Sequence, residues 1–254
     1  EGSAITMTYR VRGSEDAQLD KVAPAVDKVL GEQMQRLAAY IDASAPPKTG
    51  KLEERFIESA GARLRFVEAG RGEPVILLHD AGASIETQWL DTGLMAAVAR
   101  GFRAIALEAR DPGDVTHLMD QLGLARAHVV GYGRGAEMAA KLAVTSPQRL
   151  QTLTLAGATS LRSSAPAEEL RGLAVSDEEM VALPVPTLGI VGMQDPAVRD
   201  FVELKRVMPR LVRMIALEDA THATAPASRD FPLALTYFLR YHPMPKQVSA
   251  SGVH

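Results

Sequence analysis

Short apolar runs recur along most of this chain, and the stretches between them have the apolar spacing of helices. These mainly apolar segments cover residues 74–79, 103–109, 127–132, 150–157, 187–192 and 211–217, and we expect each to be a strand. Residues 74–79, PVILLH, form a continuous apolar run, which is typical of a strand that a sheet buries on both faces. The intervening spacing predicts helices over 86–99, 114–122, 197–207 and 229–241, with one more beginning just after residue 133. Strands that alternate with helices predict an α/β fold, in which helices cover both faces of a mostly parallel central sheet.

The beginning of the chain has a different pattern. Residues 54–59 and 63–69 flank Gly61 and predict a hairpin. Before it, residues 4–12 alternate like a strand, and residues 18–42 carry one apolar stripe at helical spacing. We therefore divide the chain into an extension (1–51, with a linker from residue 43), a main domain (52–243) and a disordered tail (244–254). The helix of the extension either packs on the main domain or serves as an arm through which two copies form a homodimer.

Composition excludes several classes of function. The net charge of −3 gives no electrostatic reason to bind nucleic acid or an anionic membrane. No apolar run reaches the roughly 18 residues that a membrane-spanning helix needs. Because cysteine is absent, disulfides, thiolate nucleophiles and cysteine-ligated zinc are excluded, and the histidines lack metal-binding spacing, so we expect no metal. Since the first residue is Glu1, we expect that a leader peptide or a tag was removed, and the protein could be cytoplasmic or exported.

The segment HVVGYGRGAEMAA, residues 128–140, carries the most informative motif. It combines a short apolar strand, a turn of alternating glycines and a helix of small residues. That is the shape of a nucleophile elbow, G-x-S-x-G, in which a serine lies on a strained strand-to-helix turn. Here Gly133 stands at the nucleophile position, so the hydroxyl is missing. Glycine is the relaxed occupant of such a backbone, and the alternative is an engineered exchange of the serine.

Together with three other segments, this motif resembles the α/β-hydrolase fold family over residues 52–243. The other segments are RLRFVEAGRGEPVILLHDAGAS (63–84), VPTLGIVGMQDPAV (185–198) and LEDATHATAPASRDFPLALTYFL (217–239). The resemblance places the catalytic acid at Asp195 and the catalytic base at His222, in the family's order of elbow, acid and base. The alternatives are that Asp195 caps the helix after Pro196 and that His222 lies on a surface loop.

The resemblance also implies an oxyanion hole made by the backbone amides of Ala81 and Arg134. Asp80 stands beside it, where the family usually has glycine, and a carboxylate there opposes the negative charge that develops in acyl transfer. Asp80 could instead cap the following helix, act as a general base or act as a carboxylate nucleophile. The cap region, 158–184, is short and includes a helix N-terminus at 176–180, which favours a shallow, open site.

A dinucleotide site is the rival interpretation of the glycine motif, because GYGRGA (131–136) also matches G-x-G-x-x-A. That site needs an acidic residue at the end of the next strand, which reads TLAGATS instead. We therefore expect neither a nicotinamide nor a flavin, and no other cofactor.

Three functional hypotheses remain for a small-molecule substrate or ligand. The first is an esterase-like enzyme that acts on a small ester, lactone or other carbonyl compound through a His222–Asp195 general-base dyad, without a serine. The second is a catalytically silent binding protein of the same fold, and the third is a serine hydrolase whose nucleophile was exchanged. An acid and a base that are still in place favour the first and third, whereas Asp80 favours the first and second. The sequence therefore favours the first.

Overall fold

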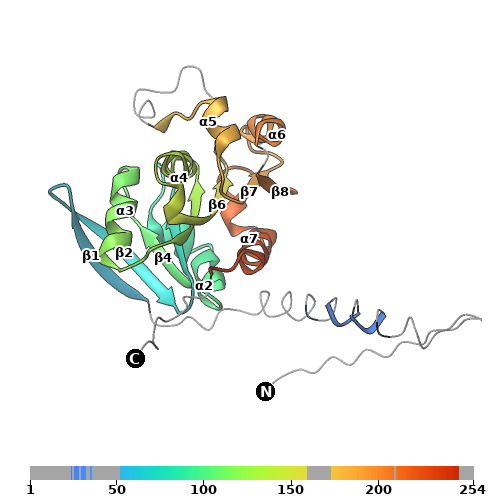
Figure 1. Ribbon diagram of the computed structural model, residues 1–254, viewed down its shortest axis with the longest axis horizontal. Coiled ribbons are helices and arrows are strands. Elements are labelled where there is room, and N and C mark those ends of the chain that lie inside the picture. The colour runs from blue at the N-terminus through green and yellow to red at the C-terminus, as the bar shows by residue number, and fades with distance from the viewer. Residues whose placement is uncertain are drawn as a thin grey trace, which may run out of the picture. The chain divides into compact units, whose positions relative to one another are not determined.

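The computed structural model describes residues 24, 26–28, 30–32, 35, 52–158, 173–208 and 210–245. The chain divides into two units, Glu1–Ala45 and Pro46–His254. The described residues of the first unit are helical and fall inside the predicted helix 18–42. The predicted strand 4–12, the linker and the pairing of two copies lie outside the described residues. The second unit, coloured from cyan to red in Figure 1, contains the central sheet and the candidate site.

One sheet of eight strands forms the centre of the second unit, in the order β1-β2-β4-β3-β5-β6-β7-β8. The strands are β1 (Glu53–Ser59), β2 (Ala62–Gly70), β3 (Pro74–Leu78), β4 (Arg103–Leu107), β5 (Ala127–Tyr132), β6 (Leu150–Ala156), β7 (Thr187–Gly192) and β8 (Leu211–Leu217). The pairs β1–β2 and β2–β4 are antiparallel, and all the others are parallel. The predicted fold class, including the hairpin at Gly61, is confirmed.

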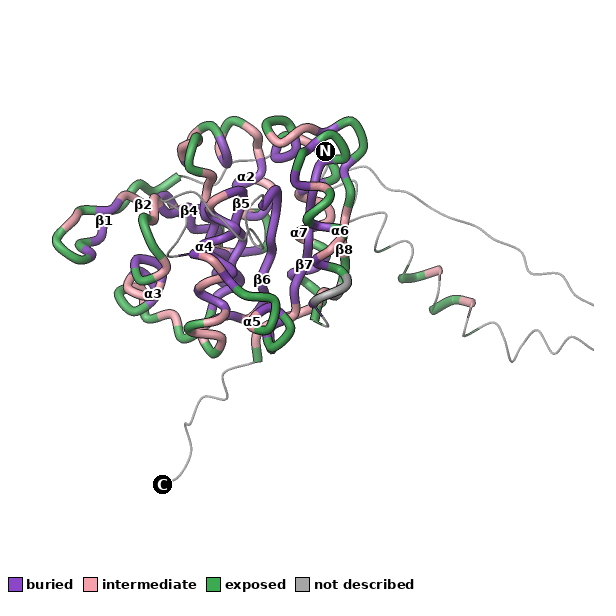
Figure 2. Tube along the Cα trace, turned by 90° about the horizontal axis from the view of Figure 1, so that it is seen from above, coloured by how far each residue is buried: buried purple, intermediate pink, exposed green. Residues whose placement is uncertain are grey.

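Helices cover both faces of this sheet. They are α2 (Leu94–Ala99), α3 (Pro112–Gln121), α4 (Arg134–Thr145), α5 (Asp177–Ala182), α6 (Val198–Val207) and α7 (Asp230–Tyr241), with a π-helical turn η2 (Glu86–Leu90) and 3-10 turns η3 (Pro147–Arg149) and η5 (Ala225–Ala227). Apolar side chains of α3, α4, α5 and α6 join one core cluster, and those of α2 and α7 join the other. Figure 2 shows the buried strands between these layers.

Local chemistry explains where several elements differ from the prediction. The predicted helix 86–99 is two pieces, η2 and α2, because Gly93 between them adopts a positive φ of 73°. Helix α3 begins at Pro112, earlier than predicted, since the Asp111 side chain accepts hydrogen bonds from the amides of Gly113 and Asp114. The acidic segment at 176–180 does begin a helix, with a reciprocal capping box between Ser176 and Glu179.

The ends of the main domain are also partly described. Within the predicted cap, 158–184, the structure describes Ala158 and residues 173–184. Of the predicted tail, only Met244 and Pro245 are described, and the Met244 amide donates to Glu73 Oε1 at 3.1 Å. In the part of the chain that the structure describes, no helix combines the length and apolar character needed to span a membrane.

Candidate active site at the carboxyl ends of the strands

Four polypeptide segments meet at one edge of the sheet. Asp80 follows β3, Gly133 follows β5, Asp195 follows β7 and His222 follows β8. The carboxyl ends of parallel strands share an edge, so residues that are far apart in the sequence come together there. The four positions that the sequence analysis considered for catalysis therefore lie at one edge of the sheet.

Backbone geometry at Gly133 matches the shape of the motif. Gly133 has φ 52° and ψ −121°, between the end of β5 and the start of α4. A side chain on Gly135 would lie 2.8 Å from the carbonyl oxygen of His79 and closer still to that of Leu78. The small residues therefore let the first turn of α4 lie directly against the end of β3, and this brings the Arg134 amide beside Asp80.

His222 is held on its Nδ1 side by Asp195. The Nδ1···Oδ2 distance is 2.8 Å, and the Asp195 side chain is fully buried. The other oxygen of Asp195, Oδ1, accepts from the Ala197 amide at 2.8 Å, just before α6. The interpretation of Asp195 as a helix cap is wrong, because α6 begins after Ala197 and has no side-chain cap.

Tyr132 fixes the loop that carries His222. Its hydroxyl donates to the backbone carbonyl of His222 at 2.5 Å, and the two rings lie 5.1 Å apart at 59°. Burial raises the pKa of Tyr132 far above neutrality, so the phenol keeps its proton. Sequence reasoning did not identify this residue, although it lies inside the glycine motif.

The Asp80 side chain points into the site, where it contacts two backbone amides and His222. Its Oδ1 accepts hydrogen bonds from the backbone amides of Ala81 and Arg134, both at 2.8 Å. Its Oδ2 lies 3.1 Å from Nε2 of His222. The interpretation of Asp80 as a helix cap is wrong, because η2 begins after Ile85 and has no side-chain cap. The two amides predicted for the oxyanion hole, called the amide pair below, do converge on one oxygen atom, and that atom belongs to Asp80.

The two carboxylates make His222 a stable cation. The hydrogen bond with Asp80 is the largest influence, and together with Asp195 it outweighs burial and raises the pKa of His222 to about 9. Burial by itself would raise the pKa of Asp80, but the hydrogen bonds from His222, Arg134 and Ala81 outweigh it and hold that pKa below its usual range. At neutral pH the site is therefore an imidazolium between two carboxylates.

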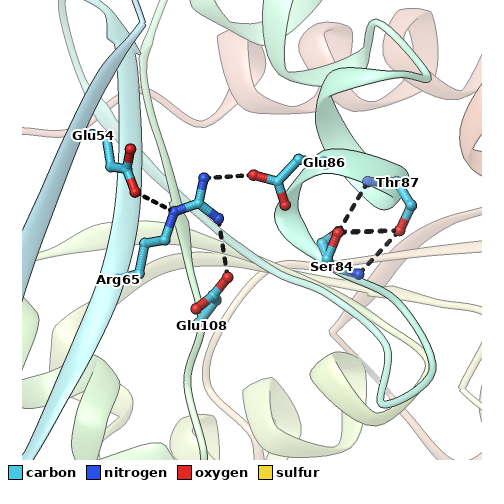
Figure 3. Close-up of polar contacts among 6 residues, drawn as sticks. All are labelled: Glu54, Arg65, Ser84, Glu86, Thr87 and Glu108. Atoms are coloured by element: carbon cyan, nitrogen blue, oxygen red, sulfur yellow. Dashed lines mark hydrogen bonds and ion pairs between the residues drawn. The ribbon is translucent and has the colours of Figure 1, made fainter.

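The loop between β3 and η2 is anchored from outside the site. Arg65 of β2 binds Glu54 at 2.7 Å, Glu108 at 3.1 Å and Glu86 of η2 at 2.5 Å (Figure 3). Beside it, the Ser84 amide donates to Thr87 Oγ1 at 3.0 Å. Within the loop, Nδ1 of His79 lies 2.7 Å from the Asp80 carbonyl oxygen.

His128 has a structural environment at the opposite end of the strands. Its buried ring lies 2.8 Å from Thr152 Oγ1 and 3.2 Å from Glu73 Oε2. Burial lowers its pKa, and Glu73 opposes that effect. The sequence showed no partner for His128, because its neighbours come from other strands and loops.

Comparison with known protein sequences finds relatives over part of the chain. No family model matches the chain. It is 40% identical over 55 residues to a 2-hydroxy-6-oxo-6-(2'-aminophenyl)hexa-2,4-dienoic acid hydrolase of Metapseudomonas resinovorans, covering 22% of this chain and 19% of that protein. It is 30% identical over 118 residues to the dihydrolipoyllysine-residue acetyltransferase component of the acetoin cleaving system of Cupriavidus necator, covering 40% and 31%. The chain thus spans less than a third of the length of these relatives.

Solved structures match over far more of the chain. A meta-cleavage product hydrolase from Pseudomonas fluorescens IP01 superposes with a TM-score of 0.64 at 21% identity, covering 74% of this chain and 98% of that one. A carboxylesterase from Bacillus subtilis gives 0.64 at 13% identity, covering 83% and 99%. The chain has the α/β-hydrolase fold.

Proposed function

We propose that the protein hydrolyses a small ester, lactone or other carbonyl compound without a serine nucleophile. His222 acts as the general base, Asp195 orients it, and the amide pair binds the substrate oxygen. The observation that carries this proposal is the convergence of His222 Nε2 and the amide pair on one carboxylate, at 3.1, 2.8 and 2.8 Å. The relative from Metapseudomonas resinovorans, which is named as a hydrolase of an oxo-dienoic acid, supports a carbonyl substrate.

Water replaces the absent hydroxyl as the nucleophile. His222 takes a proton from water as the water oxygen attacks the carbonyl carbon, and negative charge develops on the oxygen held by the amide pair. When the tetrahedral intermediate collapses, the carbon–oxygen bond to the leaving group breaks and His222 returns the proton to that group. Asp195 stays ionised and keeps Nδ1 protonated throughout. An ester gives a carboxylic acid and an alcohol, and a lactone gives a single hydroxy acid.

Asp80 must leave the amide pair before this reaction begins. Its departure also removes the hydrogen bond that contributes most to the raised pKa of His222. The pKa of His222 then falls towards its ordinary value, and the imidazole becomes available as a base near neutral pH. The entering substrate oxygen therefore displaces Asp80 from the amide pair. The loss of Asp80 in turn makes His222 available as a base.

The test measures turnover of a short p-nitrophenyl ester and of a small lactone panel. His222→Ala should lower kcat/KM by about 10²–10⁴-fold, the usual worth of general-base catalysis. The matched control is His117→Ala, which removes a half-buried histidine of α3 that contacts Gln121. Equal turnover in the His222 and His117 variants would overturn the proposal.

A silent binding protein is the second candidate, and one observation favours it. Asp80 fills the amide pair, and His222 holds a proton at neutral pH, so the arrangement resists hydrolysis until both change. Saturable binding of a carbonyl compound with no product, in the wild type and in Asp80→Gly alike, would select this candidate. A simple exchange of serine for glycine is less favoured, because the Asp80 carboxyl group occupies the space of a side chain at Gly133.

A further inference from the structure

We infer that the amide pair and His222 form a binding site for the carboxylate group of a ligand, and that Asp80 is a tethered stand-in for that group. The inference deepens the proposed function and rests on it for the identity of the ligand as a reaction product. It concerns the same site and names the chemical class that the site binds.

The donors of the site match both oxygens of a carboxylate. Two amides, from Ala81 and Arg134, bind one oxygen, and the imidazole of His222 lies beside the other. While His222 keeps its proton, a single carbonyl oxygen would use the amides and leave Nε2–H without an acceptor among the described residues. A carboxylate satisfies all three N–H groups at once, and hydrogen bonds to an ionised acceptor are the stronger kind.

The charges favour the same class of ligand. With Asp80 withdrawn, the buried carboxylate of Asp195 remains as a charged partner of His222. An incoming carboxylate restores the second ion pair that the folded protein has built with Asp80. A neutral ligand cannot form this second ion pair with His222.

The site is open enough for this exchange. The side chains of His222 and Asp80 are 32% and 27% exposed. Ala81 and Gly82, which follow Asp80, are exposed, and no atom of the described residues lies within 4 Å of a Cβ built on Gly82. The Asp80 side chain is therefore carried by an accessible loop rather than by the packed core.

Hydrolysis by the proposed route leaves a carboxylate in this position. One product oxygen comes from the carbonyl held by the amide pair, and the other comes from the attacking water beside His222. The proton released when the acid ionises goes to solvent. The resting arrangement with Asp80 thus has the form of a product complex, and we expect small carboxylates to bind as products and inhibit turnover.

The experiment titrates sodium acetate into Asp80→Gly and follows the backbone amide signals of Ala81 and Arg134 by NMR at pH 6.5. Acetate should bind saturably and at least about tenfold more tightly than to the wild type, where a tethered carboxylate competes at an effective concentration in the millimolar range or above. Sodium chloride at equal ionic strength and methylammonium chloride are the control salts. Asp80→Asn is the control variant, because its side chain has the same shape as Asp80 and keeps the amide pair filled.

The results distinguish this inference from the proposed function. No shift of the two amide signals with acetate, or equal shifts with chloride, would overturn the inference, as would unchanged acetate binding in Asp80→Gly/His222→Ala. Asp80→Ala provides a second open variant, so that poor folding of one protein leaves the test intact. Acetate binding without turnover of any ester upholds the inference and overturns the proposed function, and turnover without acetate binding does the reverse.

Discussion

The carboxyl group of Asp80 lies where the side chain of any residue larger than glycine at position 133 would have to be. A Cβ built on Gly133 would lie 2.8 Å from Oδ2 of Asp80, and closer to Oδ1. The two residues are far apart in the sequence, yet the position of the Asp80 side chain depends on the glycine at position 133. Glycine leaves room for the carboxylate, and the carboxylate occupies the amide pair and bonds to His222.

Restoring a serine should therefore require two changes. Gly133→Ser alone should show little esterase activity, because the new side chain collides with Asp80 and the backbone at φ 52° strains a non-glycine residue by about 1–3 kcal/mol. Asp80→Gly/Gly133→Ser removes the collision and should hydrolyse p-nitrophenyl acetate with a burst of p-nitrophenol. Equal activity of the single and double variants would contradict the spatial exclusion of the two side chains.

The imidazolium between two carboxylates should make stability depend on pH. The pKa of His222 is about 9 in the folded protein and about 6.5 in an unfolded chain, so its contribution is complete below pH 6.5 and is lost as the pH rises through 9. Since the side chain is 32% exposed, solvent screening limits this loss to about 1–2 kcal/mol. Urea unfolding at pH 6.5 and 9.5 measures it.

Asp80→Asn is the control for that measurement. The amide replaces the carboxylate whose hydrogen bond contributes most to the raised pKa of His222, so the variant should lose less stability over this pH interval than the wild type does. The same pH dependence in both proteins would show that other groups determine it. The pKa of Asp80 is lowered by folding, so its own contribution is lost only in acid, below about pH 4.

The close approach of α4 to β3 should make Gly135 intolerant of a side chain. Gly135→Ala should destabilise the protein by at least about 3 kcal/mol, because the methyl group meets backbone carbonyls that cannot rotate away. Gly82→Ala is the matched control, since open space surrounds that position, and it should change the unfolding free energy by less than about 0.5 kcal/mol. Similar unfolding midpoints in urea for the two variants would contradict this packing.

Arg65 should contribute more stability than an ordinary surface arginine. Arg65→Ala leaves Glu54, Glu86 and Glu108 without their shared cation, and we expect a loss of about 1–2 kcal/mol that shrinks at high salt. Arg55→Ala, which removes a more exposed arginine paired with Glu68, should cost less than about 1 kcal/mol. Thermal unfolding at low and high ionic strength compares them, and equal losses would argue against the anchoring of η2 by Arg65.

The strands could be predicted because their signals are local. The run 74–78 is continuous and apolar, and the structure buries every residue of it as a strand. The break in the predicted helix 86–99 was missed because the apolar spacing continues across Gly93. The Arg65 cluster could not be predicted, since its three glutamates come from separate parts of the chain and no local pattern links them.

The sequence by itself determined the alternation of strands and helices, the glycine turn without a hydroxyl and the identity of the residues at the strand ends. Each of these follows from periodicity or from residue type within a few positions. Only the tertiary structure decided that Asp80 enters the amide pair and that His222 lies between two carboxylates. The direction of one side chain depends on the space and the hydrogen-bond donors that other strands bring to it, and these are fixed only when the sheet has formed.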